Sequence, residues 1–323
     1  MGKLHIVLYH YTRDLRHSRY PKIKGLDLEL FKEQIQWFTR GGQFVPVTME
    51  QVLAAVEGKY TLPENALLFT FDDGYIDNYL YAMPVLQEFG VQGSFFIPGK
   101  TFSTHQLLDV NKIHYVLASA EENSRLPELL KDVFSKMQEY RSKEFNYPDN
   151  KALYDKYASA SRFDSAEIVF IKQMLQTVLP EAVRNKISSD LFEKYVGVSE
   201  KQLAYELYMN ADQIRTMKRN GMYIGIHGYD HYWLGNLPRE QMEADIDKAL
   251  EVMDEFIDAD AWVMNYPYGN YNAVVLEYIK SKGCRLGLTT EVRVADIVND
   301  SVLEFPRLDC NDFPPKSENF IRF

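Results

Sequence analysis

The sequence predicts an α/β fold in which a parallel sheet or barrel is wrapped by helices. Short apolar runs rich in β-branched residues alternate with longer stretches of helical periodicity, which is typical of repeated strand–helix units. The chain has 323 residues, 46% of them hydrophobic and 25% charged, with only 17 glycines and 13 prolines. This length and composition can bury a sizeable core, and they exclude disordered and collagen-like classes.

The first third of the chain shows the alternation most clearly. Helix 29–40 is stopped by Gly41 and Gly42, and the spacing of Thr48 to Gln51 fits a capping box. The elements expected here are a strand over 4–9, a helix over 29–40, a short strand over 44–47, a helix over 49–57, a strand over 66–71, a helix over 78–89 and a strand over 93–98.

Residues of about 105–209 interrupt this pattern. The segment is rich in Leu, Tyr, Lys and Glu and lacks clear strand runs, so we interpret it as a helical insertion within one domain spanning 1–323. The strand–helix pattern then resumes with a strand over 222–226, a helix over 239–257, a strand over 261–265, a helix over 272–282, a strand over 285–289 and a turn-rich end over 291–323.

Charge and apolar patterning limit the class of partner. A net charge of −10 argues against a nucleic acid or an anionic membrane as the main partner. No window approaches 18 apolar residues, the first ten residues lack a signal-peptide run, and Cys284 and Cys310 are the only cysteines. We therefore expect a soluble, cytoplasmic protein with no transmembrane segment.

Polar residues follow several of the predicted strands. His10, Asp72 with Asp73, His227, and the segment Asn265–Tyr268 all stand at such positions. In a β/α barrel the carboxyl ends of the strands share one rim, where active sites are built, so these residues are expected to converge.

This set of residues suits a metal ion. His227 and His231 are four residues apart, a spacing that fits a metal pair but also an incidental or structural role. Asp72 and Asp73 repel one another unless a cation or a shared proton relieves them, although a turn or a helix N-cap is the alternative explanation. One aspartate and two histidines supply three ligands and leave a position open for water, and the second aspartate could act as base.

Two of these motifs carry a family resemblance. Thr70-Phe71-Asp72-Asp73-Gly74 and His227-Gly-Tyr-Asp-His231 resemble the first two motifs of the polysaccharide deacetylases, carbohydrate esterase family 4. Tyr266-Pro-Tyr268-Gly resembles part of the third motif, and the Tyr-His-Tyr sequence at 9–11 is similar to the start of a subset of that family. The resemblance covers about 1–100 and 210–310.

The resemblance implies a fold and a reaction. The fold would be a distorted (β/α)7 barrel with the helical insertion between the two metal motifs. Asp72 would be the catalytic base, Asp73, His227 and His231 the ligands of a divalent metal, for which we expect zinc, and the Tyr268 backbone N–H an oxyanion donor. The reaction would be metal-dependent hydrolysis of an N-acyl group, acetyl or formyl, from an amino sugar of a surface polysaccharide or glycan precursor.

The chain also departs from the family pattern. Asn265 stands where the family often has an arginine that orients the base, and Gly228 replaces a serine or threonine between the histidines. No histidine follows His231, so the family's C-terminal general acid is absent, and His10 is our preferred replacement. Arg307 is a candidate for binding substrate or for ordering Asp72, with a surface ion pair as the alternative.

Candidate substrate contacts are Tyr75, Tyr266, Asn265 and Arg307, although most aromatic residues simply pack the core. Two other functions stay open. One is a non-catalytic carbohydrate-binding relative, and the other is a glycoside hydrolase that pairs one carboxylate with a partner such as Asp230 or Asp309. The sequence does not indicate an oligomeric state.

Overall fold

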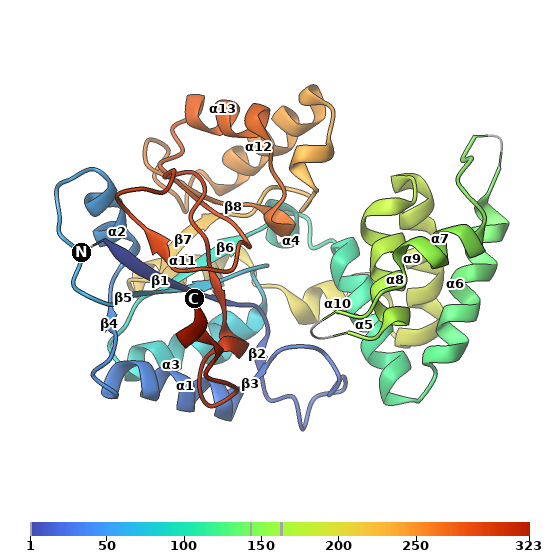
Figure 1. Ribbon diagram of the computed structural model, residues 1–323, viewed down its shortest axis with the longest axis horizontal. Coiled ribbons are helices and arrows are strands. Elements are labelled where there is room, and N and C mark those ends of the chain that lie inside the picture. The colour runs from blue at the N-terminus through green and yellow to red at the C-terminus, as the bar shows by residue number, and fades with distance from the viewer. Residues whose placement is uncertain (1, 143, 162–163) are drawn as a thin grey trace. The chain divides into compact units, whose positions relative to one another are not determined.

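The computed structural model describes residues 2–142, 144–161 and 164–323. It divides into two compact units, which are described separately (Figure 1). The first comprises the chain up to Asp14 together with Gly25–Gln106 and Tyr205–Phe323. The second comprises Leu15–Lys24 and Leu107–Ala204.

The first unit is built on a nine-stranded sheet. Its main path runs in the order β10 (Ala295–Asp296), β1 (Lys3–Tyr9), β5 (Ala66–Phe71), β6 (Gly93–Ile97), β7 (Tyr223–Ile226), β8 (Val263–Asn265) and β9 (Leu286–Leu288). The path from β1 to β9 is parallel throughout, whereas β10 is antiparallel to β1. Two short strands add to it in parallel, β4 (Val45–Pro46) beside β5 and β11 (Leu308–Asp309) beside β1.

The two ends of the sheet are linked by the segment that leads into β11. Thr289 N–H donates to the Phe305 carbonyl at 2.8 Å, and Phe305 N–H donates to the Gly287 carbonyl at 2.8 Å. Because β11 pairs with β1, this segment connects the last strand to the first. The sheet is therefore curled, and the predicted distorted (β/α) barrel is confirmed.

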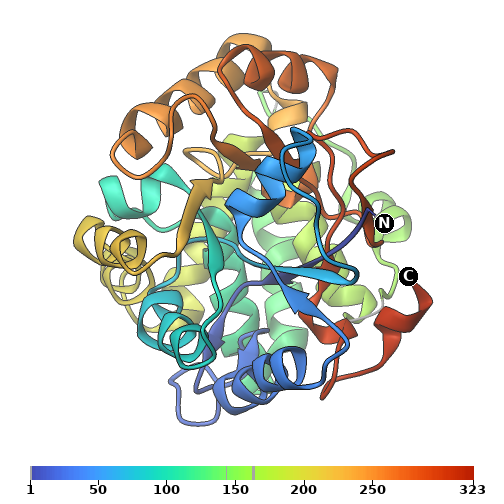
Figure 2. The same cartoon turned by 90° about the vertical axis from the view of Figure 1, so that its left-hand side faces the viewer.

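Helices surround the strands in the order that the sequence predicts (Figure 2). Thr48 and Gln51 form the predicted capping box at the start of α2, and Asn210 with Gln213 forms another at α11. The helical elements are α1 (Leu28–Arg40), α2 (Met49–Val56), η1 (Asn78–Ala82), α3 (Met83–Glu88), α4 (Gly99–Ser103), α11 (Ala211–Arg219), η3 (Leu234–Asn236), α12 (Arg239–Met253), η4 (Pro267–Gly269), α13 (Ala273–Ser281), η5 (Cys310–Asp312) and η6 (Asn319–Arg322). A two-stranded pair, β2 (Thr12–Arg13) with β3 (Leu26–Asp27), completes the unit.

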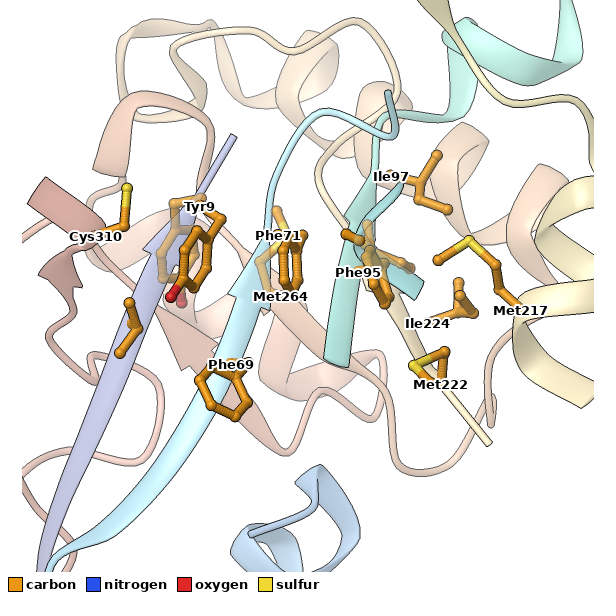
Figure 3. Packing of buried hydrophobic residues seen from close by; sticks show 14 of the residues in the cluster. Tyr9, Phe69, Phe71, Phe95, Ile97, Met217, Met222, Ile224, Met264 and Cys310 are labelled. Carbon is orange, nitrogen blue, oxygen red and sulfur yellow. The ribbon is translucent and has the colours of Figure 1, made fainter. Parts of the chain in front are cut away.

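Both faces of the central strands are buried, and successive side chains along each strand point to opposite faces. Tyr9, Phe71 and Phe95 stack face to face across β1, β5 and β6, with ring centroids 4.9 and 4.6 Å apart (Figure 3). They belong to the core that packs against the surrounding helices, whereas Ile6 and Leu68 belong to a second, inner cluster. Thr70, Asp72 and Asn265 continue the inner alternation, which directs these polar side chains to the end of the barrel interior.

The second unit is helical. Its elements are α5 (Asp109–Glu122), α6 (Leu126–Tyr140), α7 (Asn150–Tyr157), α8 (Ala166–Gln173), η2 (Met174–Val178), α9 (Glu181–Val196) and the start of α10 (Glu200–Leu207). The sequence predicts a helical insertion over about 105–209, and residues 15–24 are an addition it does not anticipate. The description of 1–323 as a single domain stays a prediction.

Across the described residues, no helix combines the length and the hydropathy that a membrane span requires.

Candidate active site

The carboxyl ends of four parallel strands bring the predicted polar residues together. His10 follows β1, Asp72 and Asp73 follow β5, His227 follows β7, and Asn265 ends β8. Ion pairs and hydrogen bonds join all of these residues within the first unit. The convergence expected from parallel strands is therefore present.

Asp73, His227 and His231 form a compact cluster. The Asp73 Oδ1 atom lies 3.4 Å from His227 Nε2 and 3.3 Å from His231 Nε2, and the two Nε2 atoms are 3.2 Å apart. All three side chains are buried, and their candidate ligand atoms lie within 4.8 Å of one another. Asp73 Oδ1 has no hydrogen-bond partner among the described residues, although a buried carboxylate oxygen normally has one.

The hydrogen bond of His227 turns a lone pair toward this cluster. His227 Nδ1 lies 2.6 Å from the Asn265 carbonyl, which can only accept, so Nδ1 carries the hydrogen and the neutral ring leaves a lone pair on Nε2. Burial lowers the pKa of His231, which favours its neutral form.

Tyr75 holds the other oxygen of Asp73. Its hydroxyl donates to Asp73 Oδ2 at 2.6 Å, and burial, with the charge of Asp73, raises the pKa of Tyr75 well above 10, so the hydroxyl keeps its proton. The side chain is 0% exposed. This placement does not favour the predicted contact of Tyr75 with substrate, because the side chain is buried and its hydroxyl faces Asp73.

Asp72 points into a different set of partners. Arg307 donates to both of its oxygens, at 2.8 and 2.9 Å, and to the Asn265 side-chain oxygen at 2.9 Å. Burial raises the pKa of Asp72, but the Arg307 guanidinium more than offsets it, so the pKa falls below its usual value. Asp72 is therefore ionised at neutral pH, as a base must be.

This arrangement bears on two of the candidate substrate contacts. Arg307 was a candidate for binding substrate or for ordering Asp72, and its guanidinium, 2% exposed, lies on Asp72. Asn265, a candidate substrate contact, is fully buried, and its side-chain oxygen accepts a hydrogen bond from Arg307. Arg307, from a distant part of the chain, thus supplies the positive charge that Asn265 lacks.

His10 lies at the open side of Asp72. Its Nε2 atom is 3.9 Å from Asp72 Oδ2, and its side chain is 42% exposed. The residue therefore stands next to the base and in reach of solvent, which fits the proposed placement within the site.

Tyr266 and Tyr268 belong to the same sequence motif, but their side chains lie in different environments. Tyr266 is fully buried and donates its hydroxyl to the Leu303 carbonyl at 2.8 Å, so its side chain packs in the core rather than facing substrate. The Tyr268 ring is partly exposed, lies edge to face with His231 at 4.6 Å and stacks on Trp233 at 4.3 Å. The Tyr268 ring therefore borders the cluster of Asp73, His227 and His231.

Backbone strain gathers at this site. Six non-glycine residues have positive φ among those described, and Asp73, His231 and Tyr268 are three of them, with φ of 73°, 58° and 58°. Such conformations cost about 1–3 kcal/mol each and persist where surrounding contacts impose them. Their concentration here supports a functional site.

Asp245, in α12, is a residue that the sequence reasoning missed. Its oxygens accept the Tyr229 and Asp230 backbone N–H groups at 3.0 and 2.8 Å, which fixes the loop between the two histidines. Burial raises the pKa of Asp245 to about 6. The signal was present, because Asp245 occupies the apolar stripe of α12 with Met242, Ile246 and Ala249, all buried.

Asp230 and Asp309 are the carboxylates suggested as partners of Asp72 in a two-carboxylate hydrolase. Asp230 pairs with Lys100, and Asp309 accepts the Asn311 backbone N–H at 2.8 Å as a cap of η5. The structure therefore offers no specific observation in favour of the glycoside hydrolase alternative.

Two proteins of known sequence are similar to this chain. YxkH of Bacillus subtilis (strain 168), which is named as a putative polysaccharide deacetylase, is 19% identical to this chain over 290 residues. The match covers 90% of this chain and 65% of the length of YxkH. The poly-beta-1,6-N-acetyl-D-glucosamine N-deacetylase of Escherichia coli (strain K12) is 41% identical over 58 residues, 18% of this chain and 8% of its own length. The chain thus spans less than two thirds of either relative.

Solved structures share the fold. The Streptococcus pyogenes deacetylase PplD in complex with acetate matches with a TM-score of 0.58 at 15% identity, over 100% of this chain and 98% of that one. IcaB from Ammonifex degensii matches with a TM-score of 0.58 at 18% identity, over 99% and 96%. The family model described as polysaccharide deacetylase matches residues 59–178 and 191–287, more than half of the sequence. The chain therefore belongs to the polysaccharide deacetylase family.

Proposed function

We propose that the protein is a metal-dependent carbohydrate N-deacylase that removes an acyl group, acetyl by default and formyl as the variant, from an amino sugar. The observation that carries this proposal is the unpartnered Asp73 Oδ1 facing two imidazole Nε2 atoms, with the ionised Asp72 next to it in the chain. Family membership and the shared fold support it.

The donor set fits a divalent metal. One carboxylate oxygen and two imidazole nitrogens are ligands that zinc accepts, and three protein ligands are the number found in catalytic zinc sites. Asp73, His227 and His231 would hold the ion, for which zinc is the expected identity. When bound, such an ion polarises a carbonyl and lowers the pKa of water towards about 7.

Asp72 is the proposed base. Arg307 and Asn265 fix its orientation, and the ion pair keeps it ionised and ready to accept a proton from the attacking water. The same ion pair makes Asp72 a weaker base than an isolated carboxylate, so the reaction depends on a water whose acidity is already increased.

His10 and Tyr268 complete the proposed mechanism. His10 stands 3.9 Å from Asp72 with its ring partly in solvent, where it could protonate the leaving amine. The Tyr268 backbone N–H is the proposed donor to the oxyanion, and this residue has a positive φ of 58°.

The proposed substrate is an N-acylated amino sugar within a polysaccharide or a glycan precursor. The relatives support this class, since the Escherichia coli protein is a poly-beta-1,6-N-acetyl-D-glucosamine N-deacetylase and the Streptococcus deacetylase structure holds acetate. A cytoplasmic location is part of the proposal, and it favours nucleotide-linked or lipid-linked precursors over a finished extracellular polymer.

Metal removal tests the proposal. Purified protein is expected to release free amine from N-acetylated glucosamine oligosaccharides, to lose this activity after chelation and to recover it when zinc or another divalent metal is added back. A panel of polymeric, nucleotide-linked and lipid-linked donors identifies the substrate. Protein that binds no divalent metal and releases no amine from any donor, while a known deacetylase works in parallel, would contradict the assignment.

A further inference from the structure

We propose that Tyr75 is a positioning residue of the metal site, where it orients Asp73 so that one carboxylate oxygen alone faces the two histidines. This inference rests on the proposed metal site and assigns a role to a residue outside the set of ligands.

The two oxygens of Asp73 have different partners, because the Tyr75 hydroxyl bonds only one of them. It donates to Oδ2 at 2.6 Å, while Oδ1 lies 3.3–3.4 Å from the histidine Nε2 atoms. A carboxylate held through one oxygen cannot rotate freely or present both oxygens to a cation. The ligand is therefore set in its binding orientation before any ion arrives.

The ring of Tyr75 is itself held in place. It stacks on Tyr11 with centroids 4.0 Å apart and planes 12° apart, and a second parallel ring, Tyr208, lies 6.2 Å away. The Arg13 guanidinium lies over the Tyr11 ring at 5.0 Å and forms two hydrogen bonds to Asp77, at 2.6 and 3.0 Å. A partly buried ion pair thus supports the stack that carries the hydroxyl.

The backbone around Asp73 adds to this constraint. Asp73 and Gly74 have φ of 73° and 66°, and the Gly74 carbonyl accepts the Met209 N–H at 3.1 Å. A Cβ at Gly74 would come within 2.7 Å of the Ile97 side chain, so the turn fits tightly against β6. Backbone and hydroxyl together restrict Asp73, and loss of such outer contacts typically weakens metal binding 10–100-fold.

Tyr75→Phe tests the role, with Tyr9→Phe as a matched control. The Tyr9 hydroxyl is also fully buried and donates at 2.6 Å to a side-chain oxygen, but that acceptor is Gln34 rather than a ligand. The affinity of the metal-free proteins for Zn²⁺ is measured by competition with a chromophoric chelator. Tyr75→Phe is expected to weaken it about 10–100-fold, and Tyr9→Phe to leave it within about twofold of the wild type.

Several outcomes overturn the inference. If Tyr75→Phe binds Zn²⁺ as tightly as the wild type, the role of Tyr75 is overturned while the proposed function stands. The same holds if Tyr75→Phe and Tyr9→Phe lose Zn²⁺ affinity equally. A wild-type protein that binds no divalent metal would overturn the proposed function as well. If Tyr75→Phe does not fold, Tyr11→Leu decides: it removes the supporting ring and is expected to weaken Zn²⁺ binding by a smaller factor, and unchanged affinity would overturn the inference.

Discussion

Asp72 and Asp73 are neighbours in the chain but occupy opposite environments. Asp72 meets a guanidinium through both oxygens, so its charge is neutralised and its hydrogen bonds are made. Asp73 faces the Nε2 atoms of two imidazoles, and its Oδ1 has no hydrogen-bond partner in the part of the chain that the structure describes. The two adjacent carboxylates therefore differ in chemistry, because the turn after β5 directs them toward different partners.

The first prediction separates the two aspartates. Asp72→Asn is expected to lower kcat about 10²–10⁴-fold, since a general base is lost, while the zinc content stays at the wild-type level. Asp73→Asn is expected to lose both zinc and activity, because a ligand is removed. Steady-state amine release and metal analysis of the same preparations provide the measurement. Wild-type turnover in Asp72→Asn would refute its assignment as base.

The second prediction tests the ion pair of Asp72. Arg307→Gln leaves a buried carboxylate without its cation, so the free energy of unfolding is expected to fall by about 3–5 kcal/mol. Arg293→Gln is the control, because Arg293 also bonds an aspartate but its side chain is 36% exposed, and a loss of at most about 1 kcal/mol is expected. Urea unfolding of both variants measures the difference. Similar losses in the two variants would show that burial is not what gives Arg307 its importance.

The third prediction adds another buried carboxylate to the comparison. Asp245 has two backbone donors but a raised pKa of about 6, whereas the pKa of Asp72 is lowered beside Arg307. An acid whose pKa is raised on folding binds protons more strongly in the folded state, so its contribution to stability falls as pH rises.

Asp245→Asn cannot titrate and therefore isolates this contribution. The stability of the wild type relative to Asp245→Asn is expected to decrease by about 2 kcal/mol between about pH 4.5 and 7. Urea unfolding of the metal-free proteins across this range gives the difference in unfolding free energy. A difference that stays constant, or rises with pH, would mean that the two N–H donors outweigh the effect of burial on Asp245.

Much of the fold could be predicted because its signals are local. The strand over 66–71 and the capping box of Thr48 with Gln51 are present as expected, since both depend on neighbouring residues. Helix 239–257 ends early, at Met253, and the strand expected over 261–265 is shorter, at Val263–Asn265. Ends of elements depend on packing and are harder to derive than their existence.

The sequence alone determined which residue types stand after each strand and how the strands alternate with helices, because hydrophobic periodicity and motif spacing are properties of the chain itself. Only the tertiary structure decided that Arg307 meets Asp72 across 235 positions, that Tyr75 bonds Asp73 instead of facing substrate, and that Asp245 anchors the histidine loop. These contacts depend on strand register and side-chain direction, which are fixed when distant segments pack together.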